Sequence, residues 1–284
     1  MSDFVALLGT KGGPMIRPGS TMPTSSLLSL GGRLVVVDCG LGVARGIVDQ
    51  GISLKDLSLI FITHLHSDHY LELGPLLHTA WCAGLRTDVQ VWGPPELGAY
   101  WQGFLASMEF DIATRIEDEG RPDLRQLVTI HPVTPDAPMS FGDLTVTAIR
   151  TEHPPLVDCY AFRFQAGDKA VVFSGDTARL PALETFAAGA NLLIHEAMLE
   201  PALPGLMARI GNGDGRLMHH WLRAHTTAED AAKTAAAAGV GALALHHLIP
   251  SDDPDFTAAE WRANTAPHFA GEIHVGHDGL RIPL

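Results

Sequence analysis

Short apolar runs, separated by polar or glycine-rich turns, recur along the whole chain. They lie at residues 34–38, 57–63, 89–92, 144–149, 160–164, 170–174, 192–195 and 240–246. Residues 35–37 are apolar on both faces of an extended strand, whereas residues 144–148 alternate apolar and threonine side chains. The first pattern is typical of a strand that is covered on both faces, and the second of a half-exposed strand. We therefore expect a β-rich protein, with a Gly/Pro/Ser-rich segment at residues 9–26 before the first of these strands.

Helical patterns are clearest in the second half of the chain. Residues 226–230 read Thr-Thr-Ala-Glu-Asp, a capping-box arrangement that predicts the start of an alanine-rich helix at residues 228–238. Gly239 ends this helix, and the chain runs directly into the last apolar run. Such a helix-to-strand unit is typical of a layered α/β fold.

A second helical region lies between the third and fourth apolar runs. Aromatic side chains recur at roughly helical spacing in residues 96–127, which predicts an insertion of one or two helices. They are Tyr100, Trp101, Phe104 and Phe110. These side chains could form a substrate wall, part of the core or a dimer contact, and the sequence leaves these alternatives open. No internal repeat or low-complexity linker divides the chain, so we expect one domain over residues 1–284.

Composition narrows the function classes. The chain has 19 Lys+Arg against 32 Asp+Glu, a formal charge of −13, and no basic run. Binding a polyanion depends on cationic side chains that neutralise phosphates, so this balance disfavours nucleic acid as a partner. A hydrophobic content of 46% supports a large core, and no apolar run approaches the roughly 18 residues of a membrane helix. We therefore expect a globular, cytoplasmic protein with no membrane partner.

Histidine is the unusual residue type, because the chain has 15 of them. Residues 64–69 read His-Leu-His-Ser-Asp-His directly after the second apolar run. A turn that leaves the carboxyl end of a strand can aim His64 and His66 at one point and Asp68 and His69 at another, so this spacing predicts two metal ions. The three cysteines have no paired spacing, which argues against a thiolate site. Imidazole and carboxylate donors favour Zn²⁺, with Mn²⁺ and Fe as weaker candidates.

Later strands also end in candidate ligands. His153, Asp176 and the neighbouring pair His246 and His247 each lie at the end of a predicted strand. In a layered fold such strand ends meet at one edge, so we expect these side chains to complete the metal sites. Alternation along the last strand does not decide between the two neighbouring histidines.

The order of these motifs resembles the metallo-β-lactamase superfamily of dinuclear metal hydrolases, whose hallmark is the H-x-H-x-D-H motif matched at residues 64–69. The resemblance covers most of the chain, from Val-Asp-Cys-Gly at residues 37–40 through Ser-Gly-Asp-Thr at 174–177 to Leu-Ala-Leu-His-His at 243–247. It implies an α/β (α+β) fold, a four-layer αββα sandwich that carries the helical insertion at residues 96–127.

The resemblance also implies which residues bind two divalent ions. One ion would take His64, His66 and His153, the other would take Asp68, His69 and His247, and Asp176 would bridge them. The branch that includes ribonuclease Z and the arylsulfatases ends its last strand in Leu-x-Leu-Thr-His, and this register favours His247 over His246.

Two further motifs resemble the same branch. They are His-Glu-Ala at residues 195–197 and His-Thr-Thr at residues 225–227. By that resemblance His225 lies beside the metals as a transition-state stabiliser or general acid, and Glu196 orients it. Without the resemblance, His225 would simply precede a capped helix. Asp38, at the end of an apolar strand, is expected to accept a hydrogen bond from a ligand histidine.

This site implies hydrolysis by a hydroxide that bridges the two ions, with Asp68, His225 and Glu196 as the catalytic residues. We expect the substrate to be a small-molecule ester of the aryl sulfate or phosphodiester type. The ligands alone do not choose among a sulfur, phosphorus or carbon centre, so a lactonase or other carbonyl-ester hydrolase is the main alternative.

Two other functions of the same superfamily are less favoured. Ribonuclease Z enzymes usually carry a long arm that clamps transfer RNA, but only 22 residues separate His153 from Asp176. Together with the charge of −13, this disfavours RNA processing. An iron redox enzyme that resembles the flavodiiron proteins would need a flavodoxin-like extension, and the absence of one in these 284 residues disfavours this function. Relatives are often dimers, so a homodimer stays an open alternative.

Overall fold

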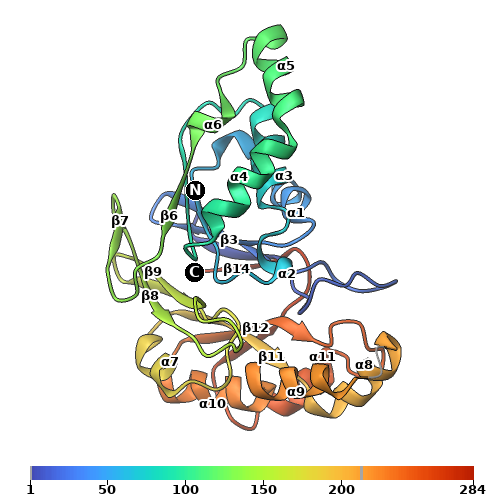
Figure 1. Cartoon of the computed structure of the whole chain (residues 1–284). Helices are drawn as coiled ribbons and strands as arrows, with labels where there is room; N and C mark the ends of the chain where they lie inside the picture. Colours follow the sequence, from blue (N-terminus) through green and yellow to red (C-terminus); the bar gives the residue numbers. More distant parts are fainter. Residues whose placement is uncertain (1, 212–213) are drawn as a thin grey trace.

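Two seven-stranded β-sheets lie face to face in the computed structural model, which describes residues 2–211 and 214–284 (Figure 1). One sheet has the strand order β14-β1-β2-β3-β4-β5-β6, and the other has the order β13-β12-β11-β10-β9-β8-β7. Helices cover the outer face of each sheet. The expected α/β sandwich with four layers is therefore confirmed.

The first sheet is built from both ends of the chain. Its strands are β1 (Phe4–Gly9), β2 (Ser25–Leu30), β3 (Arg33–Cys39), β4 (Leu59–Phe61), β5 (Val89–Gly93), β6 (Val128–Pro132) and β14 (Leu280–Pro283). β14, β1, β2 and β3 pair antiparallel, and β3 to β6 pair in parallel. β3 is buried from Val35 onward because other layers cover both of its faces, as its continuous apolar run predicts.

The second sheet carries most of the later motifs. Its strands are β7 (Met139–Phe141), β8 (Leu144–Arg150), β9 (Tyr160–Ala166), β10 (Lys169–Phe173), β11 (Leu192–Met198), β12 (Ala242–Ile249) and β13 (Glu272–Val275). β7 to β10 pair antiparallel, and β10 to β13 pair in parallel. Leu144, Val146 and Ala148 are buried while the residues between them are partly exposed, which confirms the alternation predicted for this strand.

The inner faces of the two sheets form one apolar layer. Phe61 of β4 packs edge to face against Phe162 and Phe164 of β9, with ring centroids 5.2 Å apart in both pairs. Buried aromatic pairs of this kind contribute about 0.5–1.5 kcal/mol beyond the area that they bury. They hold β4 of one sheet against the other sheet, so the strand ends that carry the polar motifs stay close together.

Helices that pack on the two sheets form the outer layers. They are α1 (Val43–Asp49) and α3 (Leu73–Cys82) on the first sheet, and α7 (Pro181–Phe186), α10 (Ala228–Ala238) and α11 (Ala258–Thr265) on the second. α10 begins and ends where predicted: the Thr227 side chain accepts a hydrogen bond from the backbone N–H of Asp230, and Gly239 ends the helix with a φ of 61°. None of the helices that the structure describes is long and apolar enough to cross a lipid bilayer.

The insertion between β5 and β6 is helical, as predicted. It contains α4 (Leu97–Ser107), α5 (Glu109–Glu119) and α6 (Leu124–Leu127), and Figure 1 shows α5 at the end of the molecule that lies farthest from α10. Trp101 is buried and stacks on Phe104, with ring centroids 5.7 Å apart. The Phe104 ring lies against Gly74 of α3, only 2.3 Å from the position that a Cβ would take. The insertion is therefore anchored on the first sheet's outer core, while Phe110 is 86% exposed.

Several elements were not predicted from the apolar pattern. They are the strands β1, β2, β6, β7, β13 and β14, the helices α1, α2 (Ser67–Tyr70), α3, α7, α8 (Leu203–Ile210), α9 (Gly215–Ala224) and α11, and two short 3₁₀ turns (Leu54–Asp56 and Glu200–Ala202). β2 reads Ser-Ser-Leu-Leu-Ser-Leu and is buried on all six residues, and its serines, two of them at the end of the Gly/Pro/Ser-rich segment, mask it as a core strand. Residues 10–24, here called the N-terminal loop, extend from the sheets beside α2 (Figure 1).

Candidate metal centre

The histidine motif occupies the turn from β4 into a short helix, α2 (Ser67–Tyr70). His64 and His66 precede this helix, whereas Asp68 and His69 lie inside it. The turn of helix between the two pairs aims them at two neighbouring points. The other expected ligands follow β8 and β10 or lie in β12, so all of them come from strand ends at one edge of the sandwich.

One group of converging side chains consists of His64, His66, His153 and Asp176, whose ligand atoms all lie within 4.8 Å of one another. His66 Nδ1 lies 2.9 Å from His153 Nε2 and 3.2 Å from His64 Nε2. Asp176 Oδ2 lies 3.6 Å from His64 Nε2. Three imidazole nitrogens and one carboxylate oxygen thus surround a single point.

A second group consists of Asp68, His69 and His247, again within 4.8 Å of one another. Asp176 Oδ2 lies 3.1 Å from His247 Nε2 and 3.4 Å from His69 Nε2, so the same oxygen reaches both groups. The structure therefore brings together all seven residues expected as metal ligands, in the two sets expected, with Asp176 between them.

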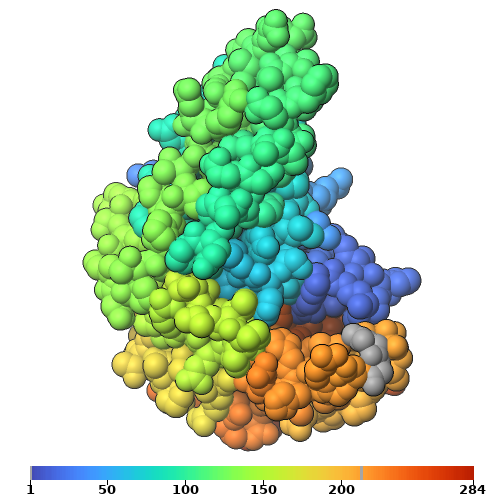
Figure 2. Space-filling view, viewed as in Figure 1, coloured from blue at the N-terminus to red at the C-terminus, as the bar shows by residue number. Residues whose placement is uncertain are grey.

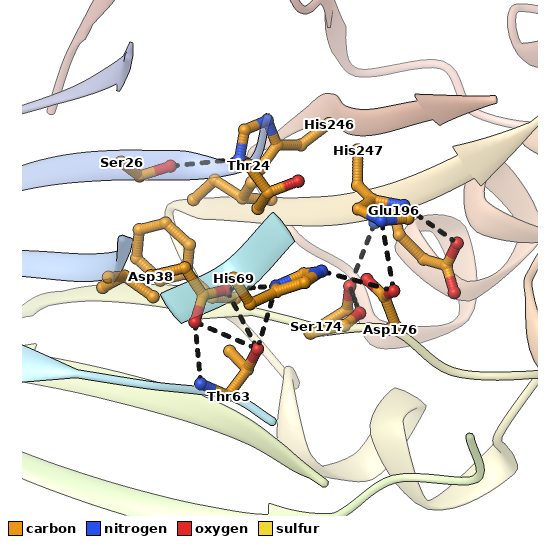
Figure 3. Close-up of a pocket in the computed structure, with 14 residues that line it drawn as sticks. Thr24, Ser26, Asp38, Thr63, His69, Ser174, Asp176, Glu196, His246 and His247 are labelled. Atoms are coloured by element: carbon orange, nitrogen blue, oxygen red, sulfur yellow. Dashed lines mark hydrogen bonds and ion pairs between the residues drawn. The ribbon is translucent and has the colours of Figure 1, made fainter. Parts of the chain in front are cut away.

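The structure separates His246 from its neighbour. β11 and β12 pair in parallel, and their register shifts by one residue at His247, which has a left-handed φ of 45°. His247 Nε2 lies 3.3 Å from Asp68 Oδ2. His246 Nε2 instead lies 3.2 Å from Ser26 Oγ of the first sheet (Figure 3). A bulge at this position breaks the two-residue period, which is why alternation alone did not choose between the two histidines.

Buried polar atoms without hydrogen-bond partners mark the space between the two groups. They include His69 Nε2 and Asp176 Oδ1, both inaccessible to solvent. Such orphaned atoms are costly in a folded protein unless an ion or another group satisfies them. The two groups offer imidazole nitrogens and carboxylate oxygens and no thiolate, which fits divalent ions such as Zn²⁺, Mn²⁺ or Fe²⁺.

The electrostatics of the site also fit bound cations. Burial lowers the pKa of His153 to about 3 and that of His64 well below its usual value, so these imidazoles are neutral, as ligands must be. Burial opposes a charge on His69 too, but Asp176, Asp38 and Asp68 outweigh it and raise the pKa of His69 well above its usual value. The carboxylates thus favour positive charge at this point, which a proton or a metal ion can supply.

Hydrogen bonds from outside the two groups orient the imidazoles. His69 Nδ1 lies 2.8 Å from Asp38 Oδ2, and the backbone N–H of Thr63 donates to Asp38 Oδ1 at 2.8 Å (Figure 3). Both residues of this pair line a small cavity of about 20 Å³, whose lining side chains are drawn in Figure 3. His153 Nδ1 lies 2.8 Å from the backbone oxygen of Ala224. In both histidines Nδ1 is engaged, so Nε2 faces the site.

His225 and Glu196 form a buried pair beside the second group. His225 Nδ1 lies 2.8 Å from Glu196 Oε2, and the backbone N–H of Thr177 donates to Glu196 Oε1 at 2.6 Å. The His225 ring stacks on that of His247, with centroids 5.4 Å apart. Burial, and then the charge of Asp176, raise the pKa of Glu196. His225 lines a cavity, and its Nε2 has no hydrogen bond to the part of the chain that the structure describes.

His220 also lies at the site, although it was not among the predicted site residues. It belongs to α9, and its ring centroid lies 5.9 Å from His66, 5.5 Å from His153 and 5.6 Å from His225. Its only signal in the sequence is the doublet His219-His220 before Trp221, in a helix that the apolar pattern did not predict.

A cavity of about 310 Å³ opens onto the candidate ligands. Its lining comprises His66, Ser67, Asp68, Asp176, His220, His225 and His247 from the site, Lys11, Gly12, Gly13, Pro14, Met15 and Arg17 from the N-terminal loop, and the apolar side chains Leu206, Ile210, Leu217, Trp221 and Ile249. This volume is at the lower end of the roughly 300–1,000 Å³ of small-molecule sites.

The apolar wall of the cavity comes from α8, α9 and the end of β12, and not from the aromatic insertion. Among the residues that the structure describes, none of the insertion (96–127) lines the cavity. Figure 2 shows the insertion (green) at the opposite end of the molecule from the orange segment that contains α8 and α9. Of the three alternatives for the insertion, the structure supports core packing for Trp101.

Comparisons with known proteins extend over nearly the whole chain. Residues 7–207 match the family model described as "Anti-Pycsar protein Apyc1". The ribonuclease Z of Mycobacterium sp. (strain KMS) is 35% identical over 284 residues, with 99% of this chain and 95% of the relative covered. The metallo-β-lactamase fold protein YhfI from Bacillus subtilis superimposes with a TM-score of 0.71 at 23% identity and covers 99% of both chains. The short form of human tRNase Z has a TM-score of 0.68 at 20% identity, covering 99% of this chain and all of that one.

Proposed function

Since this chain belongs to the family described by the Anti-Pycsar protein Apyc1 model, within the metallo-β-lactamase-fold hydrolases, we propose that it hydrolyses a small-molecule anionic ester. The favoured substrate is a phosphodiester, followed by an aryl sulfate. The observation that carries this proposal is the cavity of about 310 Å³, which joins the candidate metal ligands to an apolar wall.

In this proposal two divalent ions, with Zn²⁺ preferred, bind at the two groups of converging side chains. The ligands are His64, His66 and His153 for one ion, Asp68, His69 and His247 for the other, and Asp176 for both. When bound, such ions lower the pKa of a water molecule and offset negative charge on the ester. The orphaned atoms of His69 and Asp176 support this assignment, because no group of residues 2–211 and 214–284 gives them a hydrogen bond.

His225 and Glu196 act on the leaving group. Glu196 holds the Nδ1 side of the His225 ring at 2.8 Å, so His225 Nε2 can donate a hydrogen bond or a proton to the departing oxygen. The neighbouring apolar side chains Trp221 and Leu217 pack against the organic part of the ester and exclude water from it. Asp68, which lines the cavity and accepts a hydrogen bond from the backbone N–H of Gly13 at 2.8 Å, keeps the N-terminal loop next to the reacting centre.

Phosphorus is favoured over sulfur and carbon because the curated relatives are named ribonuclease Z, and RNA is a phosphodiester. A small molecule is favoured over RNA for three reasons. The formal charge is −13, the cavity wall is apolar, and β9 and β10 occupy most of the residues between His153 and Asp176. RNA cleavage is nevertheless the second candidate function, because 35% identity to a ribonuclease Z over the whole chain supports it.

A substrate panel with purified enzyme tests both candidates. The panel contains bis(p-nitrophenyl) phosphate, p-nitrophenyl sulfate, a γ-lactone and a transfer RNA precursor with a 3′ extension. We expect the highest kcat/KM for the phosphodiester. Asp68→Ala should lower it by about 1,000-fold or more, since bound metal contributes several kcal/mol and each 1.4 kcal/mol is tenfold.

Asp143→Ala is the matched control, because Asp143 is exposed in the turn between β7 and β8. It should change kcat/KM by less than threefold. Elemental analysis should find two metal ions per chain in the wild type and fewer in Asp68→Ala. Faster cleavage of the RNA precursor than of any small ester would overturn the small-molecule proposal. Less than one metal ion per chain, with activity that survives chelation, would overturn the metal-dependent mechanism.

A further inference from the structure

The N-terminal loop is held directly against the candidate ligands. The backbone N–H of Gly12 donates to the Leu248 oxygen at 3.1 Å, and that of Gly13 donates to Asp68 Oδ2 at 2.8 Å. A Cβ on Gly12 would lie 2.9 Å from His247 Cε1, so only glycine allows this approach. Lys11, near the start of the loop, also lies at the wall of the cavity.

Lys11 is a buried cation without a carboxylate partner. Lys11 is 3% exposed, and its Nζ donates a hydrogen bond to the backbone oxygen of Gly12 at 2.9 Å. Within residues 2–211 and 214–284, no carboxylate lies within 4 Å of this ammonium group, whereas Lys169 and Lys233 are both in ion pairs. An ammonium group has three N–H donors, so two of them are left for a ligand.

The other cation of the cavity wall is already neutralised. Arg17 pairs with Asp252 through both Nε and Nη2, the latter at 2.9 Å from Oδ1. Among the described residues, Lys11 is thus the Lys or Arg of the cavity lining that has no ion pair, and the same lining contains apolar side chains of α8 and α9. A buried charge without a partner is costly, and a bound anion offsets that cost.

We propose that Lys11 binds a negatively charged oxygen of the substrate and thereby selects esters that carry a negative charge, namely phosphodiesters and sulfate monoesters, over neutral phosphotriesters and lactones. This inference rests on the proposed hydrolase function and adds a specificity residue to it. Lys11 acts as a positioning residue for the anion, and the cleaved bond and the leaving group are those of the hydrolysis already described.

A matched pair of substrates isolates the charge. Bis(p-nitrophenyl) phosphate is a monoanion, and its methyl triester is neutral with the same leaving group. In Lys11→Met the ratio of kcat/KM for the diester to that for the triester should fall by about 10- to 100-fold, the range for one charge-assisted hydrogen bond. Lys11→Arg keeps the charge and should retain the ratio within about threefold. Lys55→Met, which changes an exposed lysine, is the control.

Binding gives a second readout that does not depend on turnover. Titration calorimetry of the metal-loaded protein with phenylphosphonate should show a Kd about tenfold higher in Lys11→Met than in Lys55→Met. If the wild type cleaves neither of these esters nor any substrate of the panel above, the hydrolase proposal fails, and this titration still decides the role of Lys11. An unchanged ratio with an unchanged Kd would overturn the inference. So would an equal loss on both esters with a lowered Tm, because that result would identify Lys11 as a structural residue.

Discussion

Two helical regions each bury a tryptophan, but only one of them borders the candidate metal centre. In the insertion, Trp101 of α4 is 2% exposed and packs into the large core on the outer side of the first sheet. In the second region, Trp221 of α9 belongs to a small apolar cluster with Leu203 and Leu206, and it lines the cavity. The two tryptophans therefore have different surroundings, although both lie on helices.

The difference follows from the strands that each region connects. The insertion joins β5 to β6, and neither strand ends in a residue of the candidate site. α8 and α9 instead follow β11, whose end carries Glu196, and α9 ends directly before His225. A helix that leaves a site-bearing strand and returns to another site residue has to pass over the site. Chain connectivity, and not an apolar stripe, predicts which helix forms the wall of an active site.

The largest expected effect tests whether α9 delivers a catalytic residue. His225→Ala should lower kcat for the preferred ester by about 10²- to 10⁴-fold, the usual contribution of a general acid. Glu196→Gln should have a smaller effect, about 10- to 100-fold, because it acts through His225. Steady-state kinetics with metal-saturated enzyme measure both.

The insertion offers a matched control for this pair. His78 Nε2 lies 2.8 Å from Asp111 Oδ2, the same kind of histidine–carboxylate contact between α3 and α5. His78→Ala should leave kcat within about threefold of the wild type. If His78→Ala and His225→Ala lowered kcat equally, the distinction between the two regions would be wrong.

The second prediction concerns the stability of the insertion. Trp101→Ala removes a buried ring that stacks on Phe104, and it should lower the free energy of unfolding by about 3–5 kcal/mol. Urea denaturation measures this loss. Below the unfolding transition KM should stay within about threefold, because Trp101 does not line the cavity. A tenfold rise in KM would instead show that the insertion contacts substrate.

The predictable and unpredictable parts of the site have different physical origins. The eight strands β3, β4, β5 and β8–β12, together with α10 and the motif at residues 64–69, follow from local patterns, since apolar runs, caps and clustered donors are visible over a few residues. His247 was separated from His246 by a register shift in β12, which depends on pairing with β11 and leaves no local mark. His220 and Trp221 were not predicted as site residues because their place at the cavity depends on how α9 packs in the folded protein, which no local sequence pattern shows. Family resemblance supplied the pairing of distant ligands, which periodicity does not contain.

The third prediction tests the side of the cavity opposite α8 and α9. Burial lowers the pKa of Lys11 from 10.5 to about 8, with Arg17 lowering it further and Asp252 and Asp68 opposing the shift. A depressed lysine pKa means that the unfolded chain binds more protons between pH 8 and 10.5, so this group's contribution to stability rises with pH across that window. At pH 7 Lys11→Met should therefore be more stable than the wild type by up to about 3 kcal/mol.

The greater stability of Lys11→Met should shrink steadily from pH 8 to pH 10.5. Over this range Lys11 of the folded wild type loses its proton, and the cost of burying its charge disappears. Urea titrations at several pH values, with Lys55→Met as the reference, measure the difference. A variant that is less stable than the wild type at pH 7, with no pH dependence, would show that Lys11 supports the loop instead of carrying a buried charge.

The smallest effect sharpens the comparison most directly, because it concerns the counterpart of Trp101. Trp221 contacts protein on one side and the cavity on the other, so Trp221→Ala should raise KM by about tenfold, or about 1.4 kcal/mol of substrate binding. Its cost to stability should be smaller than that of Trp101→Ala, since fewer protein contacts are lost.

Trp221→Phe keeps an aromatic face and should restore most of the affinity. The kcat of Trp221→Ala shows whether the substitution displaces His225, because a displaced His225 would lower kcat. A Trp221→Ala variant with unchanged KM and a strongly reduced free energy of unfolding would make the two tryptophans equivalent core residues, and α9 would then be a packing helix like α4.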